Sequence, residues 1–192
     1  AMTTPVDPRI ERTRAVVLQT AVEIVAERGF AGASIDAIAQ RSGVARSTIY
    51  RHWPQKMDLL LEAVGSAAGD IGSLVVGDLR EDLVAVSTHL AELLGSEPLG
   101  SVMASIVLES RREPALDELR RKLIAQRQLA VERVIGDAMS RGDLRDTERA
   151  DVIANDLAAQ IMFRSLVLRE SMDRAWIEAL VDRVLRLQRD HR

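Results

Sequence analysis

Apolar side chains recur every three or four residues along most of the chain, which is the spacing of helices that bury one face. Val17, Ala21 and Ile24 mark such a face between about residues 9 and 28, and Gly29 follows as a C-terminal cap. No segment alternates apolar and polar residues with β-branched enrichment. The sequence therefore predicts an all-α protein of about nine helices. The further helices are expected at about residues 34–43, 45–52, 56–74, 79–94, 98–110, 114–140, 149–169 and 174–189.

Two of the predicted helices are short and meet at the glycine-containing turn Ser42-Gly43-Val44. Ser34 stands where the first of them needs an N-cap. The second, at about residues 45–52, is too short to form a core element alone. This pattern is typical of a helix-turn-helix, whose second helix enters the major groove of DNA. Ile38, Val44 and Ile49 are expected to form the apolar contact between the two helices.

The remaining positions of the second short helix carry side chains that can all donate hydrogen bonds. Donors suit phosphate oxygens and the N7 and O6 edges of purines, so these residues are candidates for DNA contact. They are Arg46, Ser47, Thr48, Tyr50, Arg51 and His52.

The charge distribution agrees weakly with binding of a polyanion by the N-terminal part. The 192 residues include 26 Lys and Arg against 29 Asp and Glu, a formal net charge of −3. Eight basic and six acidic side chains give residues 1–60 a net charge of +2, and 18 against 23 give residues 61–192 a net charge of −5. Cysteine is absent, which excludes disulfides and thiolate metal sites.

Residues 10–60 resemble the DNA-binding domain of the TetR family of bacterial transcription regulators. The resemblance lies in Phe30 after Gly29, Ser34, Ile38-Ala39, Gly43-Val44, Ser47-Thr48-Ile49-Tyr50, His52-Trp53 and Lys56 before Leu59-Leu60. The family usually has Thr at the position of Ser34 and Phe at that of Trp53. Ala45 and Ser47 stand where Ser and Gly are common. Because Ser47 adds a hydroxyl, the DNA sequence bound by a relative cannot be carried over.

The resemblance implies a role for each candidate residue. Ser34, Tyr50, His52 and Lys56 would bind phosphates, and a helix N-terminus and a lysine charge suit that task. Arg46, Ser47, Thr48 and Arg51 would lie at base edges. Simpler alternatives remain open: Ser34 as a cap alone, Tyr50 as a packing residue, His52 as a C-terminal cap and Arg51 as a solvated charge.

We expect residues 1–55 to form the DNA-binding domain and residues 56–192 a helical ligand-binding and dimerisation domain. Residues 152–168 are apolar on nearly every face, which indicates burial on more than one side. The last predicted helix carries an apolar stripe, and two such terminal helices favour a four-helix bundle with a second subunit, as in TetR-like proteins. A purely intramolecular core is the alternative. The expected interface residues are Ala154, Ala158, Ser165, Trp176, Ile177, Leu180, Val181 and Val184.

Composition alone indicates a pocket for a small apolar ligand in this domain. Methionine adapts to varied apolar molecules, although the same residues are more often simple core packing. Gln160 and Arg164 are polar within an apolar helix, and a buried polar group needs a partner, which a ligand could supply. The alternative, favoured for Arg164, is an intersubunit salt bridge or a solvent-facing edge. The candidate lining residues are Met103, Ile106, Val107, Met162, Phe163 and Leu166.

These observations favour a cytoplasmic homodimeric repressor that binds an inverted repeat in double-stranded DNA and is released by an apolar ligand. By resemblance, residues 56–74 would move as a lever, and Gly65, Gly69 and Gly72 would soften it. The alternative is a regulator that activates transcription, or one that binds a protein partner in place of a small molecule. No nucleophilic triad, glycine-rich phosphate loop or metal-binding motif is present, so we expect neither an enzyme nor a cofactor or metal. No apolar run is long enough to span a membrane.

Overall fold

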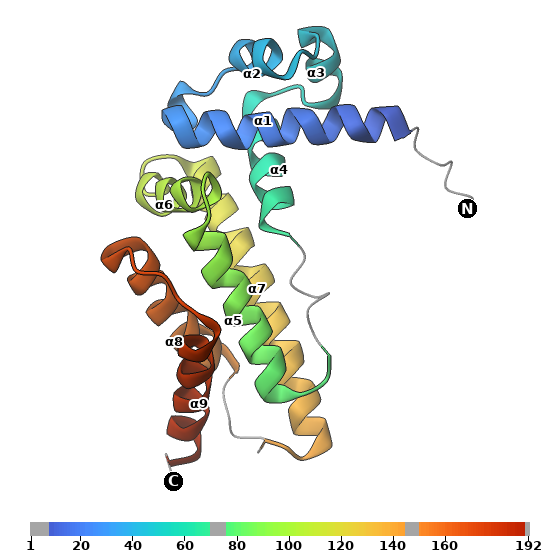
Figure 1. The fold of residues 1–192 in the computed structure, drawn as a ribbon. Helices are drawn as coiled ribbons and strands as arrows, with labels where there is room; N and C mark the ends of the chain where they lie inside the picture. The colour runs from blue at the N-terminus through green and yellow to red at the C-terminus, as the bar shows by residue number, and fades with distance from the viewer. Residues whose placement is uncertain (1–7, 70–75, 145–149, 191–192) are drawn as a thin grey trace, which may run out of the picture. The chain divides into compact units, whose positions relative to one another are not determined.

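The computed structural model describes residues 8–69, 76–144 and 150–190, and helices are the only regular elements in these ranges (Figure 1). The all-α prediction is confirmed. The predicted extension of the fourth helix to Leu74, with Ile71 and Gly72, and the predicted helix start at Arg149 lie outside the described residues. The helices are α1 Pro8–Gly32, α2 Ile35–Ser42, α3 Arg46–His52, α4 Lys56–Ala68, α5 Leu79–Gly95, α6 Leu99–Glu109, α7 Pro114–Arg141, α8 Ala150–Met162, the π-helical η2 Phe163–Leu168 and α9 Arg174–Asp190.

The chain forms two compact units. The first takes in residues 1–69 and 97–119, and the second takes in residues 70–96 and 120–192. Helix α6 therefore belongs to the same unit as α1 to α4, although it lies far from them in sequence. A compact unit is defined by contacts and a functional domain by its task, so the division at residues 55 and 56 stays a prediction.

Helix α1 is the helix on which three other helices of the first unit pack. Its apolar stripe is buried, with Val17, Ala21 and Ile24 each no more than 1% exposed, and it packs against α2, α4 and α6. The expected end at Gly29 is instead a kink, because Gly29 has a positive φ of 68° and helical turns resume up to Gly32. A positive φ suits glycine, which has no Cβ to clash with the backbone.

Helix α4 packs across α1 through buried leucines. Leu59 and Leu60 have no exposed surface, and Ala63 and Val64 extend the buried face. The helix ends at Ala68, where Gly69 adopts a positive φ of 74°. Gly69 therefore ends the helix, whereas Gly65 lies within it.

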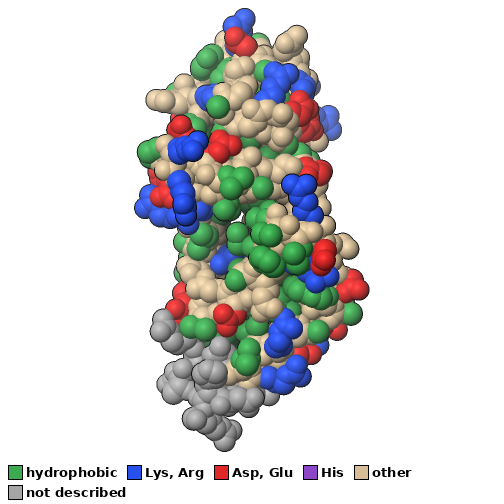
Figure 2. All heavy atoms as spheres, turned by 90° about the vertical axis from the view of Figure 1, so that its left-hand side faces the viewer, with side chains coloured by type: hydrophobic (Ala, Val, Ile, Leu, Met, Phe, Trp, Pro, Cys, Tyr) green, Lys and Arg blue, Asp and Glu red, His purple; other side chains and the backbone are tan. Residues whose placement is uncertain are grey.

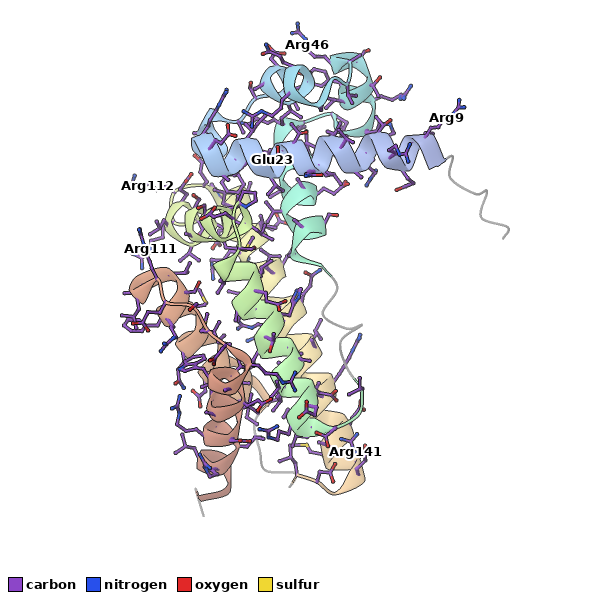
Figure 3. The ribbon with its side chains drawn as sticks, viewed as in Figure 1. Arg9, Glu23, Arg46, Arg111, Arg112 and Arg141 are labelled. Atoms are coloured by element: carbon purple, nitrogen blue, oxygen red, sulfur yellow. The ribbon has the colours of Figure 1, made fainter. Side chains whose placement is uncertain are left out.

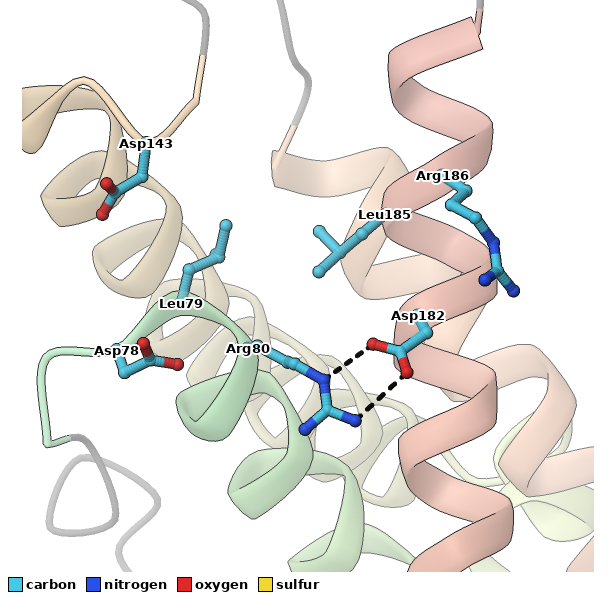
Figure 4. A pocket seen from close by; sticks show the side chains of 7 residues that line it. All are labelled: Asp78, Leu79, Arg80, Asp143, Asp182, Leu185 and Arg186. Carbon is cyan, nitrogen blue, oxygen red and sulfur yellow. Dashed lines mark hydrogen bonds and ion pairs between the residues drawn. The ribbon is translucent and has the colours of Figure 1, made fainter.

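An ion-pair network joins α5 to α9 in the second unit (Figure 4). The Arg80 guanidinium donates two hydrogen bonds to the Asp182 carboxylate, at 2.7 and 3.1 Å. Arg174 extends the network by pairing with Glu81 at 2.8 Å and Glu178 at 2.7 Å. The hydrogen bond from Arg80 lowers the pKa of Asp182. The network fixes α9 against α5.

The long apolar helix predicted for residues 149–169 is regular only up to Met162. A π-helical segment follows from Phe163, and Arg169 ends it in a left-handed conformation with φ 56°. The expected burial on more than one side holds for Ile153, Leu157 and Ile161 but fails further on. Phe163 is 55% exposed and Val167 63% exposed, although α5 contacts the π-helical segment.

In the described residues, no single helix is both long enough and apolar enough to cross a membrane, although α5 and α6 meet that test as a bent pair.

Candidate nucleic-acid interface

Helix α2 begins and ends as the sequence predicts. The Ala37 N–H donates to the Ser34 side-chain oxygen at 3.2 Å, so Ser34 caps the helix. At the other end Gly43 has φ 71°, and its N–H donates to the Ala39 carbonyl at 3.0 Å. The turn is closed by the Val44 N–H, which donates to the Ser42 hydroxyl at 3.3 Å. These bonds set the direction in which the chain enters α3.

Helix α2 is fixed to α1 by apolar packing and by an ion pair. Ile38 is completely buried, and Arg41 forms a two-pronged pair with Glu27 at 2.6 and 2.7 Å. The hydrogen bond from Arg41 lowers the pKa of Glu27. Sequence reasoning missed this pair, because its partners lie 14 residues apart and only the packing of α2 on α1 brings them together.

Helix α3 has one buried and one exposed face. Ile49 has no exposed surface and Val44, just before the helix, is half-buried, as expected for the contact with α2. Of the candidate DNA-contacting residues, Arg46, Ser47, Tyr50 and Arg51 are exposed, with Tyr50 51% exposed, whereas Thr48 and His52 are half-buried. Figure 3 shows the Arg46 side chain pointing outward from the helix.

Arg46 has a partner that the sequence analysis did not foresee. Its guanidinium pairs with Asp36 of α2 at 2.8 Å, and the two side chains are 65% and 70% exposed. An ion pair this exposed contributes little to stability. Arg46 can therefore exchange Asp36 for a phosphate or a base edge at small cost.

The two residues that follow Arg51 turn toward the core. Trp53 is only 3% exposed, and its Nε1–H donates to Glu62 of α4 at 2.9 Å. Arg14 of α1 pairs with the same carboxylate at 2.6 Å and lies 5.4 Å from the Trp53 ring centre. His52 stacks at a tilt on Trp53, with 5.6 Å between the ring centres. Trp53 thus connects α3 with α1 and α4.

Lys56 opens α4 and donates to the Phe30 carbonyl at the end of α1, at 3.2 Å. An ammonium group has three donors, so this bond leaves capacity for a phosphate. Ser34 is exposed at the N-terminus of α2, where unpaired N–H groups also suit an anion. The predicted phosphate contacts of both residues remain predictions.

The six candidate ligand-pocket residues divide between the two units. Met103, Ile106 and Val107 lie on α6 in the first unit, with Met103 and Ile106 buried and Val107 40% exposed. Met162, Phe163 and Leu166 lie in the second unit, with Phe163 exposed and the other two half-buried. The surface hollow beside the Arg80 pair is lined by other, mostly charged residues, among them Asp78, Asp143 and Arg186 (Figure 4).

The residues predicted for the dimer interface remain a prediction, and the structure gives only their burial within one chain. The chain itself already buries Ala154, Ala158, Ile177, Leu180, Val181 and Val184, none more than 4% exposed. Within one chain, these side chains pack where α9 contacts α5 and α8. Ser165 and Trp176 are half-buried. Periodicity identifies a buried face but not the neighbour that buries it.

Comparison with known proteins settles the family. Residues 17–63 match the family model for bacterial regulatory proteins of the tetR family, and residues 76–184 match that of a tetracyclin repressor-like C-terminal domain. The chain belongs to the TetR family. It is a DNA-binding transcriptional regulator, and the resemblance predicted from residues 10–60 is confirmed.

Relatives match nearly the whole TetR-family chain. The uncharacterized HTH-type transcriptional regulator Rv1556 of Mycobacterium tuberculosis is 26% identical, over 94% of this chain and 88% of its own. The DNA-binding transcriptional repressor TetR of Mycobacteroides abscessus is 27% identical, over 92% and 94%. Among solved structures, the TetR family transcription regulator SCO0332 is 27% identical with a TM-score of 0.67, over 91% of this chain and 97% of its own. All three relatives are named as transcriptional regulators or repressors.

Proposed function

We propose that this chain is a cytoplasmic homodimeric repressor that binds an inverted-repeat operator through α3 and is released by a small ligand with an apolar body. The observation that carries the DNA-binding part is the two-faced α3. Ile49 is buried and holds the helix against the rest of the unit. The exposed face carries hydrogen-bond donors from Arg46, Ser47, Tyr50 and Arg51. The name of the Mycobacteroides abscessus relative supports repression.

The short length of α3 supports dimerisation, because one helix of seven residues covers only a few base pairs. A symmetric dimer presents two such helices, about one turn of DNA apart. We place the interface on the exposed residues of the terminal helices rather than on the buried stripe. Phe163, Val167 and Leu168 are 47 to 63% exposed and lie in one segment. Figure 2 shows hydrophobic side chains on the side of the second unit that carries α8 and α9.

The test is selection of random duplex DNA by the purified protein, followed by salt titration of the enriched sequence. We expect an inverted repeat and a linear fall of log affinity with log salt. Tyr50→Ala should weaken binding at least about tenfold, the scale of one lost charge-assisted hydrogen bond, without lowering thermal stability. Arg133→Ala, at an exposed position of α7, is the matched control and should bind as the wild type does.

Failure to enrich any sequence at low salt would contradict the proposal, as would equal binding by the wild type and Tyr50→Ala. Activation instead of repression would appear when a reporter gene is placed behind the enriched operator in cells. Expression that rises with the protein would overturn repression and leave DNA binding intact.

A further inference from the structure

Helix α3 has seven residues, so its orientation depends on the contacts at its two ends. An isolated helix of this length is unstable in water, and neighbouring elements must fix the direction in which its exposed side chains point. The turn from α2 holds the start of α3. Trp53 follows the last residue, and its backbone N–H donates to the Ile49 carbonyl at 2.9 Å. The contacts of Trp53 therefore determine where the C-terminal end of α3 lies.

A single carboxylate of α4 holds the Trp53 ring. Oε2 of Glu62 accepts the hydrogen bond from the indole Nε1–H of Trp53 at 2.9 Å, and Oε1 pairs with Arg14 of α1 at 2.6 Å. The Arg14 guanidinium lies 5.4 Å from the Trp53 ring centre, which is a cation–π distance. The two oxygens of Glu62 thus connect α4 to α1 and to the end of α3.

The bond to Glu62 requires a tryptophan at position 53. Phenylalanine, which is usual at this position in the TetR family, could also fill an apolar site but has no N–H. Trp53 is only 3% exposed, and a buried indole N–H needs an acceptor. Glu62 supplies that acceptor. The polar bond adds a fixed direction to packing that an apolar ring would provide without one.

The contribution of this cluster lies in position more than in stability. The side chains of Arg14 and Glu62 are 39% and 33% exposed, and an ion pair with this exposure adds little to stability. The three residues directly before Trp53 are candidates for DNA contact, namely Tyr50, Arg51 and His52. Binding groups work when supporting hydrogen bonds hold them within about 0.5 Å of the productive geometry.

We infer that Glu62 is a positioning residue for DNA binding, which acts through the Nε1–H of Trp53. The bond sets the orientation of α3 and thereby the places of Tyr50 and Arg51 on the operator. This inference rests on the proposed function, in which α3 binds the operator. It adds a residue that acts on the operator without being one of the predicted DNA contacts.

The first test needs no DNA and measures amide hydrogen exchange of the full-length protein by mass spectrometry. Glu62→Ala should speed exchange at the C-terminal end of α3 at least about tenfold, the scale of one charge-assisted hydrogen bond. Trp53→Phe should do the same, because it removes the donor and keeps an aromatic ring. Glu62→Gln should stay close to the wild type, because its amide oxygen can still accept the bond.

Glu23→Ala is the matched control for exchange. Glu23 is a half-buried carboxylate of the same unit, as Glu62 is, but it accepts its hydrogen bond from Gln19 of its own helix, at 3.3 Å. Exchange at α3 should not change in this variant. Unchanged exchange in Glu62→Ala or Trp53→Phe would overturn the inference. So would faster exchange throughout the first unit, because Glu62 would then have a general structural role.

The second test measures affinity for the enriched operator and for a scrambled duplex. Glu62→Ala and Trp53→Phe should each bind the operator at least about tenfold more weakly. Binding of Glu62→Ala to the scrambled duplex should stay the same or rise, because the variant loses a negative charge. Glu23→Ala loses the same charge and should keep its operator affinity, and Glu62→Gln should keep it too.

The double variant shows whether Glu62 acts through Trp53. In the Trp53→Phe background, Glu62→Ala should cause no further loss of operator affinity, because the bond is already absent. Additive losses would overturn the inference, as would a loss in Glu62→Gln equal to that in Glu62→Ala.

The two tests together separate this inference from the proposed function. If the wild type enriches an operator and both Glu62→Ala and Trp53→Phe bind it as the wild type does, only the inference fails. If no operator is enriched, the proposed function fails. Hydrogen exchange then still decides whether Glu62 holds the end of α3.

Discussion

Ile49 and Tyr50 are adjacent in α3, yet Ile49 has no exposed surface and Tyr50 is 51% exposed. At the residue scale the site depends on this contrast. The buried residue determines where the helix lies, and the exposed residues determine what the helix can bind. A substitution at either position should therefore impair DNA binding for a different reason.

Ile49→Ala should destabilise the first unit by about 2–5 kcal/mol, because it removes buried methyl groups and leaves a cavity. Ser47→Ala, at an exposed position of the same helix, should change stability by less than about 0.5 kcal/mol. Urea unfolding followed by Trp53 fluorescence measures both, in a Trp176→Phe background so that the remaining tryptophan reports on the first unit. Equal midpoints for the two variants would contradict the packing role of Ile49.

At the element scale, two glycines show how the same residue type serves different purposes. Gly43 lies at the end of α2 with φ 71°, whereas Gly65 lies within α4. A Cβ added at either position would meet no atom within 4 Å. Both positions therefore have room for a Cβ, and they differ only in backbone conformation.

Gly43→Ala should destabilise the protein by about 1–2 kcal/mol, because an alanine in the left-handed conformation is strained. Gly65→Ala should stabilise it by about 0.5–1 kcal/mol, because alanine favours an ordinary helix interior. Urea unfolding of the two variants in the same Trp176→Phe background gives the signs. A stabilised Gly43→Ala would show that the turn does not require a positive φ.

At the scale of the whole molecule, the exposed apolar residues of η2, which follows α8, form the surface that we propose for a second subunit. Leu168 is 47% exposed, and Phe163 and Val167 more so, within six consecutive residues. Arg164, in the same segment, lies 5.0 Å from the Trp176 ring centre, so the segment is held to α9. An exposed apolar surface of this kind suits an interface.

Val167→Glu should convert the proposed dimer to monomers at micromolar concentration, because dimerisation through this segment would bury the new charge without a partner. Leu129→Glu, at a 53% exposed position on α7, is the matched control and should leave the dimer intact. Sedimentation velocity reports both outcomes, and operator binding should be lost with the dimer. A dimeric Val167→Glu would exclude this segment from the interface.

The sequence by itself determined the features that depend on neighbours within a few residues. The all-α class, the Ser34 cap, the Gly43 turn and the buried Ile38 and Ile49 all follow from helical period and local hydrogen bonding. The family followed as well, since its matching residues lie within one ungapped stretch of about 50 residues in the turn-containing region.

Only the tertiary structure decided which distant residues meet and which side of an apolar helix stays uncovered. It brought Arg41 to Glu27 and Arg80 to Asp182, and it assigned the stripe of α9 to the chain's own core. It also left the buried Nε of Arg127 without a hydrogen-bond partner in the described residues. The physical reason is that periodicity records how much surface a helix must bury, whereas the identity of the covering neighbour depends on contacts between residues far apart in sequence.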